Sequence, residues 1–340
     1  MHAVLLAAVC LMQDPAVSAL PTTPPHPRSY GCVFASRAPV LDGSVDHRSW
    51  SAAPWSEDFV DIEGPKHKPR PWVRTRVKML WDKKCLYIGA KMEEPRIWAT
   101  LTQRDSVIFR DNDFEVFLDP DGDNHQYVEL EMNALNTVWD LLLPRPYRDG
   151  GPAVDAFDIA GLRTGVKLEG KLNDPAHKSI GWSATIAIPW TAIKMLSSNS
   201  VPPREGDRWR INFSMVEWDL DVVEGKFHKI EGRPEHNWVW SPQWAINMHR
   251  PETWGFLEFH KTAKPVKPDP YWKERCALMD LYYRERTFRE ANGHYAQPAD
   301  LGLKFGGYFL MKDAVWLASL RVKDGAVVTV REDSRLTVVR

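Results

Sequence analysis

The most regular pattern of apolar and polar residues lies between residues 111 and 133. Two runs that alternate with a period of two flank a turn-rich centre at residues 119–124, which predicts a half-buried β-hairpin. The apolar positions are Phe114, Val116 and Leu118 on the first strand and Val128, Leu130 and Met132 on the second. We expect this face to belong to the hydrophobic core.

The other face of the predicted hairpin is acidic. It carries Asp113, Glu115, Phe117 and Asp119 on the first strand and Tyr127, Glu129, Glu131 and Asn133 on the second. If Asp119 pairs with Tyr127, Glu115 lies directly opposite Glu131, and opposed like charges destabilise a sheet by up to about 1 kcal/mol. The sequence therefore predicts a compensating cation, arginine or ligand at this face.

Strand patterns recur at short spacing along the chain. They are predicted at residues 72–81, 85–90, 137–143, 165–169, 181–188, 208–218 and 254–259. Pro189 at a first helical position marks a short helix after one of these strands. Many short strands with little helix predict an all-β fold, an antiparallel β-sandwich.

Composition divides the chain into five predicted segments. These are a signal peptide at 1–19, a Pro-rich lead at 20–29, the β-sandwich at 30–260, a linker rich in Lys and Pro at 261–270, and a C-terminal segment at 271–340. The signal peptide is predicted from a short apolar run followed by a small-residue cleavage site after Ala19, so we expect a secreted, extracellular protein. No later apolar run approaches the roughly 20 residues of a membrane span.

The C-terminal segment mixes a helical pattern with strand patterns. Apolar residues fall at helical spacing over residues 271–290, and a small β meander is predicted from residues 308–310, 315–321 and 327–330. A segment of about 70 residues is small for an independent core. We therefore expect a short α/β extension packed on the sandwich.

Charge and aromatic content narrow the class of partner. The net charge of −1 argues against nucleic acid, which needs a concentrated basic surface. Sixteen Trp residues predict a Trp-rich core, with the excess available to stack on flat sugar rings. Cleavage of the signal peptide would leave Cys32, Cys85 and Cys276 without metal-type spacing, and a Cys32–Cys85 pair stays open.

Three interpretations of the acidic face stay open. Its carboxylates and amide could accept hydrogen bonds from the hydroxyls of a ligand. They could instead pair with Arg74, Arg76 or Lys78 of a neighbouring strand. A third interpretation is catalytic, with Glu115 and either Glu131 or Glu129 as the paired carboxylates of a glycoside hydrolase or lyase.

The turn of the hairpin is a candidate calcium site. Its possible ligands are Asp119, Asp121, Asp123 and Asn124. An EF-hand is excluded, because the twelfth position, residue 130, is Leu and the flanks are strands. The alternative is a plain acidic turn, in which Asp, Gly and Asn are all favoured.

Residues 235–254 concentrate aromatic side chains in one irregular segment. The candidates for ligand contacts are Trp238, Trp240, Trp244, Met248, His249 and Arg250. A binding loop and a loop that covers the core both fit this composition. The neighbouring Met248 and His249 also suggest haem ligation, although adjacent residues seldom reach one iron and a Cys-x-x-Cys-His motif is missing.

Familiar hydrolase and transferase motifs do not occur in the sequence. There is no Gly-x-Ser-x-Gly, phosphate loop, His-Glu-x-x-His or dinucleotide fingerprint. Their absence favours binding over catalysis.

An ordered set of short motifs carries a resemblance to a known family. The motifs are Leu41-Asp-Gly-Ser-Val-Asp46 with Trp50, Arg76 to Asp82 with Leu86-Tyr87, Asn112 to Asp119, Tyr127-x-Glu-x-x-x-Asn133, Gly181-Trp to Trp190, Gly206 to Phe213 and Trp254-Gly-x-Leu. Over residues 30–259 the chain resembles the family 9 carbohydrate-binding modules, and in particular their large secreted, family-9-like subgroup. The resemblance does not cover the C-terminal segment.

The resemblance implies a calcium-stabilised β-sandwich that holds the end of a sugar between two tryptophans. By position, Glu115 is the acidic residue of that site, and Glu129, Glu131 and Asn133 are its polar residues. The two tryptophan positions fall at Phe109 and near Met248, and neither is Trp here. The resemblance leaves the stacking role to Phe109 or to tryptophans nearby, for which Trp218, Trp240 and Trp244 are the candidates.

The sequence therefore predicts a secreted, non-catalytic glycan-binding protein. The expected contacts are aromatic stacking and hydrogen bonds from carboxylates and amides. A glycoside hydrolase or lyase on the same scaffold and a haem-binding electron-transfer domain are the alternatives, and the oligomeric state is left open.

Overall fold

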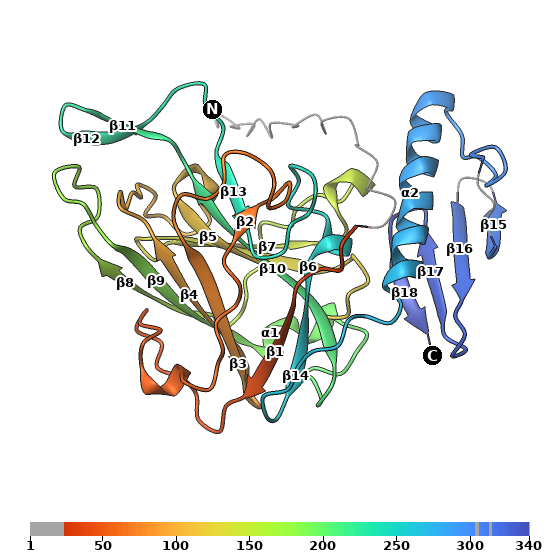
Figure 1. Ribbon diagram of the computed structural model, residues 1–340, viewed down its shortest axis with the longest axis horizontal. Coiled ribbons are helices and arrows are strands. Elements are labelled where there is room, and N and C mark those ends of the chain that lie inside the picture. The colour runs from red at the N-terminus through yellow and green to blue at the C-terminus, as the bar shows by residue number, and fades with distance from the viewer. Residues whose placement is uncertain (1–23, 303–305, 313–314, 340) are drawn as a thin grey trace, which may run out of the picture.

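The computed structural model describes residues 24–302, 306–312 and 315–339. The predicted signal peptide lies outside these residues. Figure 1 shows two parts, a large curled sheet and, beside it, a long helix that lies against a small sheet.

Within the described residues, twelve strands join into one hydrogen-bonded sheet. They are β1 (Ser29–Phe34), β2 (Val60–Asp61), β3 (Thr75–Trp81), β4 (Cys85–Glu93), β5 (Asp113–Asp119), β6 (Tyr127–Asn133), β7 (Val138–Leu143), β8 (Arg163–Glu169), β9 (Gly181–Pro189), β10 (Arg208–Glu217), β13 (His236–Val239) and β14 (Gly255–His260). The short helix α1 (Trp190–Ile193) follows β9, and a separate hairpin of β11 (Leu220–Val223) and β12 (Lys226–Lys229) projects from the sandwich (Figure 1).

The strand order is β7-β6-β5-β10-β14-β1-β3-β4-β9-β8, and β13 pairs with both β10 and β2. The sheet curls so that β5, β6 and β10 face β3, β4 and β9 across one apolar core. The prediction of an all-β sandwich is confirmed. The pairing is antiparallel except at β1, which runs parallel to both β14 and β3.

The hairpin of β5 and β6 has the predicted faces and register. Its six apolar positions lie in the core, and Glu115 is paired with Glu131. The turn between the strands needs left-handed backbone at Gly122, Asn124 and Gln126, which glycine and asparagine adopt at little cost. The register places every carboxylate of the hairpin on the opposite face from the core.

Eleven of the sixteen tryptophans are buried, so the prediction of a Trp-rich core holds for most of them. The five that keep some exposure are Trp55, Trp72, Trp139, Trp218 and Trp244. The three cysteines of the described chain are buried and free, so Cys32 and Cys85 do not pair.

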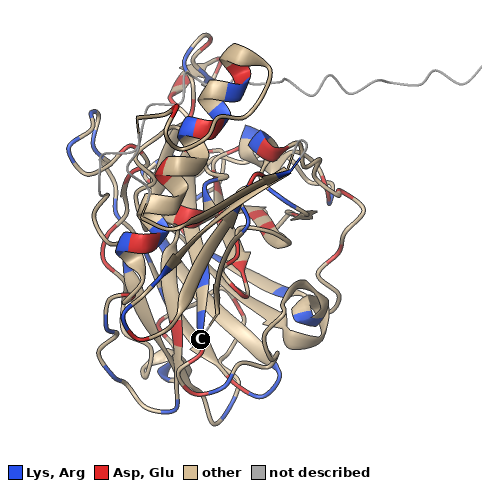
Figure 2. Cartoon of the chain, turned by 90° about the vertical axis from the view of Figure 1, so that its right-hand side faces the viewer, with Lys and Arg blue, Asp and Glu red and all other residues tan. Residues whose placement is uncertain are grey.

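The C-terminal segment contains helix α2 (Trp272–Asn292) and the strands β15 (Tyr308–Lys312), β16 (Val315–Arg321), β17 (Val327–Arg331) and β18 (Leu336–Val339). The patterns at residues 271–290, 308–310, 315–321 and 327–330 match the helix and the first three strands, whereas β18 was not predicted. One face of α2 packs on this sheet in a second apolar core. Acidic and basic residues alternate along the helix (Figure 2), and no described helix is long and apolar enough to cross a membrane.

A buried polar network joins this extension to the sandwich. The guanidinium of Arg148 lies 2.9 Å from Glu252, and both side chains are less than 5% exposed. The hydroxyl of Tyr283 on α2 donates to the same carboxylate, and Ser334 donates to Asp149 at 2.6 Å. The Pro-rich lead also contributes, because the carbonyl of Pro24 accepts from the indole of Trp272.

We expect Arg148→Met to lower the free energy of unfolding by about 3–5 kcal/mol, because it leaves the buried carboxylate of Glu252 without its main partner. Guanidinium unfolding followed by tryptophan fluorescence measures this change. The control is Arg284→Met, which removes a surface ion pair with Asp280 on α2 and should cost less than about 1 kcal/mol. Equal losses for the two variants would contradict the role given to the buried network.

Candidate functional site

The candidate site is the outer face of β5 and β6, where four carboxylates are buried. Asp113, Glu115, Glu129 and Glu131 are each at most 5% exposed. Ser214 of β10, Glu115, Glu131 and Trp139 of β7 form one row across four strands. Carboxylate oxygens of Asp113, Glu115 and Glu131 lie within 4.8 Å of one another.

Burial of these like charges strongly favours their protonated forms. Burial raises the pKa of Glu115 to about 8, and a nearby charge, that of Glu235, adds to the effect. Burial also raises the pKa values of Asp113, Glu129 and Glu131, and the neighbouring carboxylates raise them further. Two unit charges 4 Å apart repel by about 4 kcal/mol at an effective dielectric constant near 20, so this cluster is costly when ionised.

The basic residues predicted to pair with this face contact other groups. Arg74 pairs with Asp58 at 2.7 Å, and the cationic groups of Arg76 and Lys78 lie over the ring of Trp55. The interpretation of the acidic face as a surface neutralised by these residues is therefore wrong.

Phe109 covers one side of the carboxylates. Its backbone N–H donates to Glu131 at 2.8 Å, and its carbonyl accepts from the indole of Trp218 at 2.9 Å. The ammonium of Lys229, on the projecting hairpin, lies 3.3 Å from the centre of the Trp218 ring. Burial lowers the pKa of Lys229 to about 8, although Asp111, Glu235 and Asp113 oppose the shift.

His249 and Met248 lie on the other side. The hydroxyl of Tyr127 lies 2.9 Å from Nδ1 of His249, whose Nε2 is 4.0 Å from Glu129. Burial, together with Arg148, lowers the pKa of His249 to about 3, so its imidazole is neutral. The exposed ring of Tyr147 meets His249 edge-on at 4.5 Å. Phe109, the carboxylates and His249 thus come together from three separate segments.

Four of the predicted contact residues do not reach this face. Trp238 and Trp240 are fully buried in the sandwich core. Arg250 is buried with its guanidinium 5.1 Å over the ring of Tyr283, so it serves the extension. The amide of Asn133 donates to Leu101 and Asp111 and accepts from Leu135 and Thr137. Asn133 therefore holds a turn and has no remaining capacity for a sugar.

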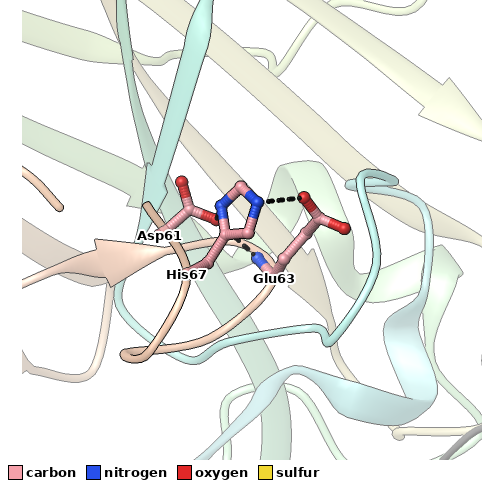
Figure 3. A group of neighbouring side chains, drawn as sticks. All are labelled: Asp61, Glu63 and His67. Carbon is pink, nitrogen blue, oxygen red and sulfur yellow. Dashed lines mark hydrogen bonds and ion pairs between the residues drawn. The ribbon is translucent and has the colours of Figure 1, made fainter. Parts of the chain in front are cut away.

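Trp244 lies at the edge of a second loop. Its ring packs so closely on Gly64 that a Cβ there would be 2.5 Å from it. The loop that contains Gly64 also holds a cluster in which His67 contacts Asp61 at 2.9 Å and Glu63 at 3.1 Å (Figure 3). Both ring nitrogens face carboxylates, and these contacts tie Asp61, Glu63 and His67 of the loop together.

The predicted calcium loop is largely satisfied by protein groups. Oxygens of Asp119, Asp121 and Asp123 lie within 4.8 Å of one another. Asp119 accepts from the N–H groups of Gly122 and Asn124, and Asp123 accepts from the guanidinium of Arg335 at 2.7 Å. Only one oxygen each of Asp121 and Asn124 is buried without a described partner. This donor set favours the acidic turn, and calcium binding by the loop stays a prediction.

The geometry also bears on the two alternatives, a paired-carboxylate enzyme and a haem-binding domain. Glu115 and Glu131 are 4% and 2% exposed, whereas a glycosidase pair has to flank a scissile bond in an open cleft. For haem ligation, the sulfur of Met248 already accepts from Gln243 at 3.1 Å and both His249 nitrogens face protein groups. Neither arrangement favours the alternative that prompted it.

Several residues of the face were not predicted from the sequence. Trp139, Ser214 and Lys229 belong to it through strand pairing or the projecting hairpin, and Tyr147 through a loop after β7. The alternation of β10 gave one usable signal, because Ser214 lies between the core residues Phe213 and Met215. Two clefts of about 410 and 440 Å³ lie away from this face, one lined by Arg148 and Tyr282 and the other by Tyr30 and Trp55.

Comparison with known proteins supports the predicted family. Residues 41–145 match the model of the carbohydrate family 9 binding domain-like family. The resemblance to the family 9 modules is confirmed over this stretch. It contains Phe109 and the carboxyl groups of the β5–β6 face, whereas Ser214 and His249 lie outside it. A search of curated proteins found no match.

One solved structure supports the fold, and a second is a more distant match. A Bacteroides uniformis protein proposed to bind carbohydrate aligns with 69% of this chain and all of its own, with a TM-score of 0.51 at 16% identity. A family 9 carbohydrate-binding module from Caldicellulosiruptor kristjanssonii, in complex with cellotriose, aligns with 71% of this chain and all of its own, with a TM-score of 0.43 at 18% identity.

The raised pKa values predict the sign of a pH dependence in the presence of a chelator. An acid with a raised pKa keeps its proton in the folded state after the unfolded chain has lost it, so stability falls as pH rises from about 4.5 to about 8. Glu131→Gln removes one group that must keep a proton in the folded state, so the variant should gain stability at pH 8 and change little at pH 5. Guanidinium unfolding at both values tests this, with Glu224→Gln on the exposed β11–β12 turn as control. If the variant is no more stable than the wild type at pH 8, the prediction that the clustered carboxyl groups destabilise the folded protein at this pH is wrong.

Proposed function

We propose that this protein is a secreted, non-catalytic glycan-binding protein that holds the end of a sugar chain at the β5–β6 face. The main support is that Phe109 and His249, from separate segments, lie on either side of an acidic face that includes Glu129. This face lies inside the region that matches the family 9 model. Secretion rests on the predicted signal peptide.

Each part of the face has a chemical use. Phe109 keeps part of its ring exposed and can stack on the apolar face of a sugar, as Tyr147 can from the other side. Glu129 can exchange hydrogen bonds with sugar hydroxyls through its carboxyl group. The neutral His249 stands beside Glu129 and can donate from Nε2.

A catalytic role for the same carboxylates is the second candidate, and it rests on one observation. The pKa of Glu115 is raised to about 8 by burial, as a general acid requires. The burial of Glu115 and Glu131 argues against a glycosidic oxygen reaching between them. Binding therefore accounts for the geometry better.

The test is binding to a glycan array followed by calorimetry on the best ligand, with cello-oligosaccharides among the probes. Phe109→Ala should weaken binding about 3- to 10-fold through lost stacking, and Phe109→Trp should restore or strengthen it. Glu129→Gln should weaken binding about 3- to 10-fold by replacing a hydrogen-bonding carboxyl group of the face. Trp72→Ala, an exposed tryptophan outside the face, is the control.

A product assay on the same glycans separates the two candidates. Turnover that requires Glu115 would replace binding by catalysis as the function. Binding that survives both Phe109→Ala and Glu129→Gln would place the sugar elsewhere on the sandwich.

A further inference from the structure

A cleft of about 410 Å³ lies where the sandwich meets the C-terminal extension. Arg145 and Arg148 line it from the loop after β7. Arg286 and Arg289 line it from helix α2, and Trp316 lines it from β16. Its volume is within the range of about 300–1,000 Å³ of small-ligand sites, which favour junctions between domains. Four arginines from two distant segments thus share one ligand-sized space.

Most of the carboxylates that line the cleft already have partners in the protein. Glu290 pairs with Arg286 at 3.0 Å, and Asp333 pairs with Arg331 at 2.7 Å. The carboxylate of Asp149 accepts hydrogen bonds from two hydroxyl groups. These acids are therefore engaged and do not compensate the other arginines of the cleft.

Two arginines of the cleft lack a carboxylate partner. Arg145 and Arg289 are exposed, and neither forms an ion pair within the described part of the chain. The guanidinium of Arg289 donates to the hydroxyl of Tyr295 at 2.6 Å, a neutral group that leaves its charge uncompensated. A guanidinium presents its N–H donors in a planar fork that matches the two oxygens of a carboxylate. The uncompensated charge of the cleft therefore favours an oxyanion.

Buried polar atoms of the lining add an independent observation. The indole N–H of Trp316, whose side chain is 1% exposed, has no acceptor among the described residues. The Nε–H of Arg148 is likewise without a hydrogen bond, although Asp149 lies 3.7 Å away. One oxygen of Glu332 is buried without a donor. Buried polar atoms are normally paired, so these atoms indicate a ligand that both donates and accepts hydrogen bonds, as sugar hydroxyls do.

We propose that this cleft binds an acidic sugar residue, a uronic acid, with its carboxylate at the two uncompensated arginines and its hydroxyls at Trp316 and Glu332. A free oxyanion such as sulfate would use the arginines but has no proton to donate to Glu332. A zwitterionic amino acid fits less well, because its ammonium group donates three hydrogen bonds, whereas the described carboxylates of the cleft other than Glu332 are engaged.

The uronic acid site goes beyond the proposed function and does not depend on it. None of the residues that line the cleft belongs to the β5–β6 face. A failure of the proposed function would remove the binding that depends on Phe109 and Glu129 and leave the binding that depends on Arg145 and Arg289. The two failures are therefore distinguishable with the same set of variants.

Calorimetry on the full chain with D-glucuronic acid and D-galacturonic acid tests the proposal. D-glucose and D-galactose are the matching neutral sugars, and inorganic sulfate is the matching free oxyanion. At least one of the two acids should bind, and added NaCl should weaken this binding because salt screens exposed charges. Sulfate should bind at least about tenfold more weakly than that acid, because it cannot make the hydrogen bonds of the sugar hydroxyls.

Variants assign the acid to the cleft. Arg145→Ala and Arg289→Ala should each weaken its binding about 3- to 10-fold, and Trp316→Phe should weaken it about 3-fold by removing one donor. Both arginines are exposed, so their variants should fold. The matched control is Arg284→Ala, which removes the same charge from α2 outside the cleft and should leave the affinity unchanged. Any binding of the neutral sugars should respond to none of the arginine variants.

Four results would overturn the proposal. The first is that neither uronic acid binds. The second is binding of the acid that Glu129→Gln weakens and Arg289→Ala preserves, which would place it at the β5–β6 face. The third is sulfate binding as tight as that of the acid and with the same dependence on the arginines, which would mean that the cleft takes a free oxyanion. The fourth is an equal loss for Arg284→Ala and Arg289→Ala, which would reduce the effect to overall charge.

Discussion

The register of the β5–β6 hairpin forces four carboxylates onto one side of a buried sheet, and the rest of the site depends on this constraint. A shift of one residue would relieve the charge repulsion but would turn Phe114, Val116 and Leu130 out of the core. Each buried side chain of this size contributes about 1.5–3 kcal/mol, so the apolar face outweighs the opposed charges. The acidic face is therefore held in place by the core behind it, and function can use its unpaired oxygens.

The surroundings of this face explain how it stays buried although no Arg or Lys of the described chain pairs with its carboxyl groups. Phe109 and its neighbour Trp218 lie on one side, and His249 lies on the other in its neutral form. Arg74 and Lys78, which the sequence suggested as its basic partners, are engaged with Asp58 and Trp55 instead. A protein that needed only stability would place an arginine here, as it does in the turn, where Arg335 meets Asp123.

The C-terminal extension is coupled to the same region. Arg148, Glu252 and Tyr283 form a buried network directly behind His249, whose backbone carbonyl accepts from Arg148. Arg335 reaches the hairpin turn from the start of β18. Helix α2 and its sheet thus hold both the loop after β13 and the turn after β5, the two connections that shape the edges of the candidate site.

The alternation of residues determined much of this protein. Period-two runs located most strands, the two faces of the hairpin and the opposition of Glu115 and Glu131, because local geometry alone sets which side chains share a face. Motif order carried the resemblance to the family 9 modules, which holds over residues 41–145. Tertiary structure decided which tryptophans are core, that Arg250 and Asn133 serve packing, and that Trp139, Ser214 and Tyr147 join the face. Those outcomes depend on which strands become neighbours and which loops cover them, and such long-range contacts leave no periodic trace in the sequence.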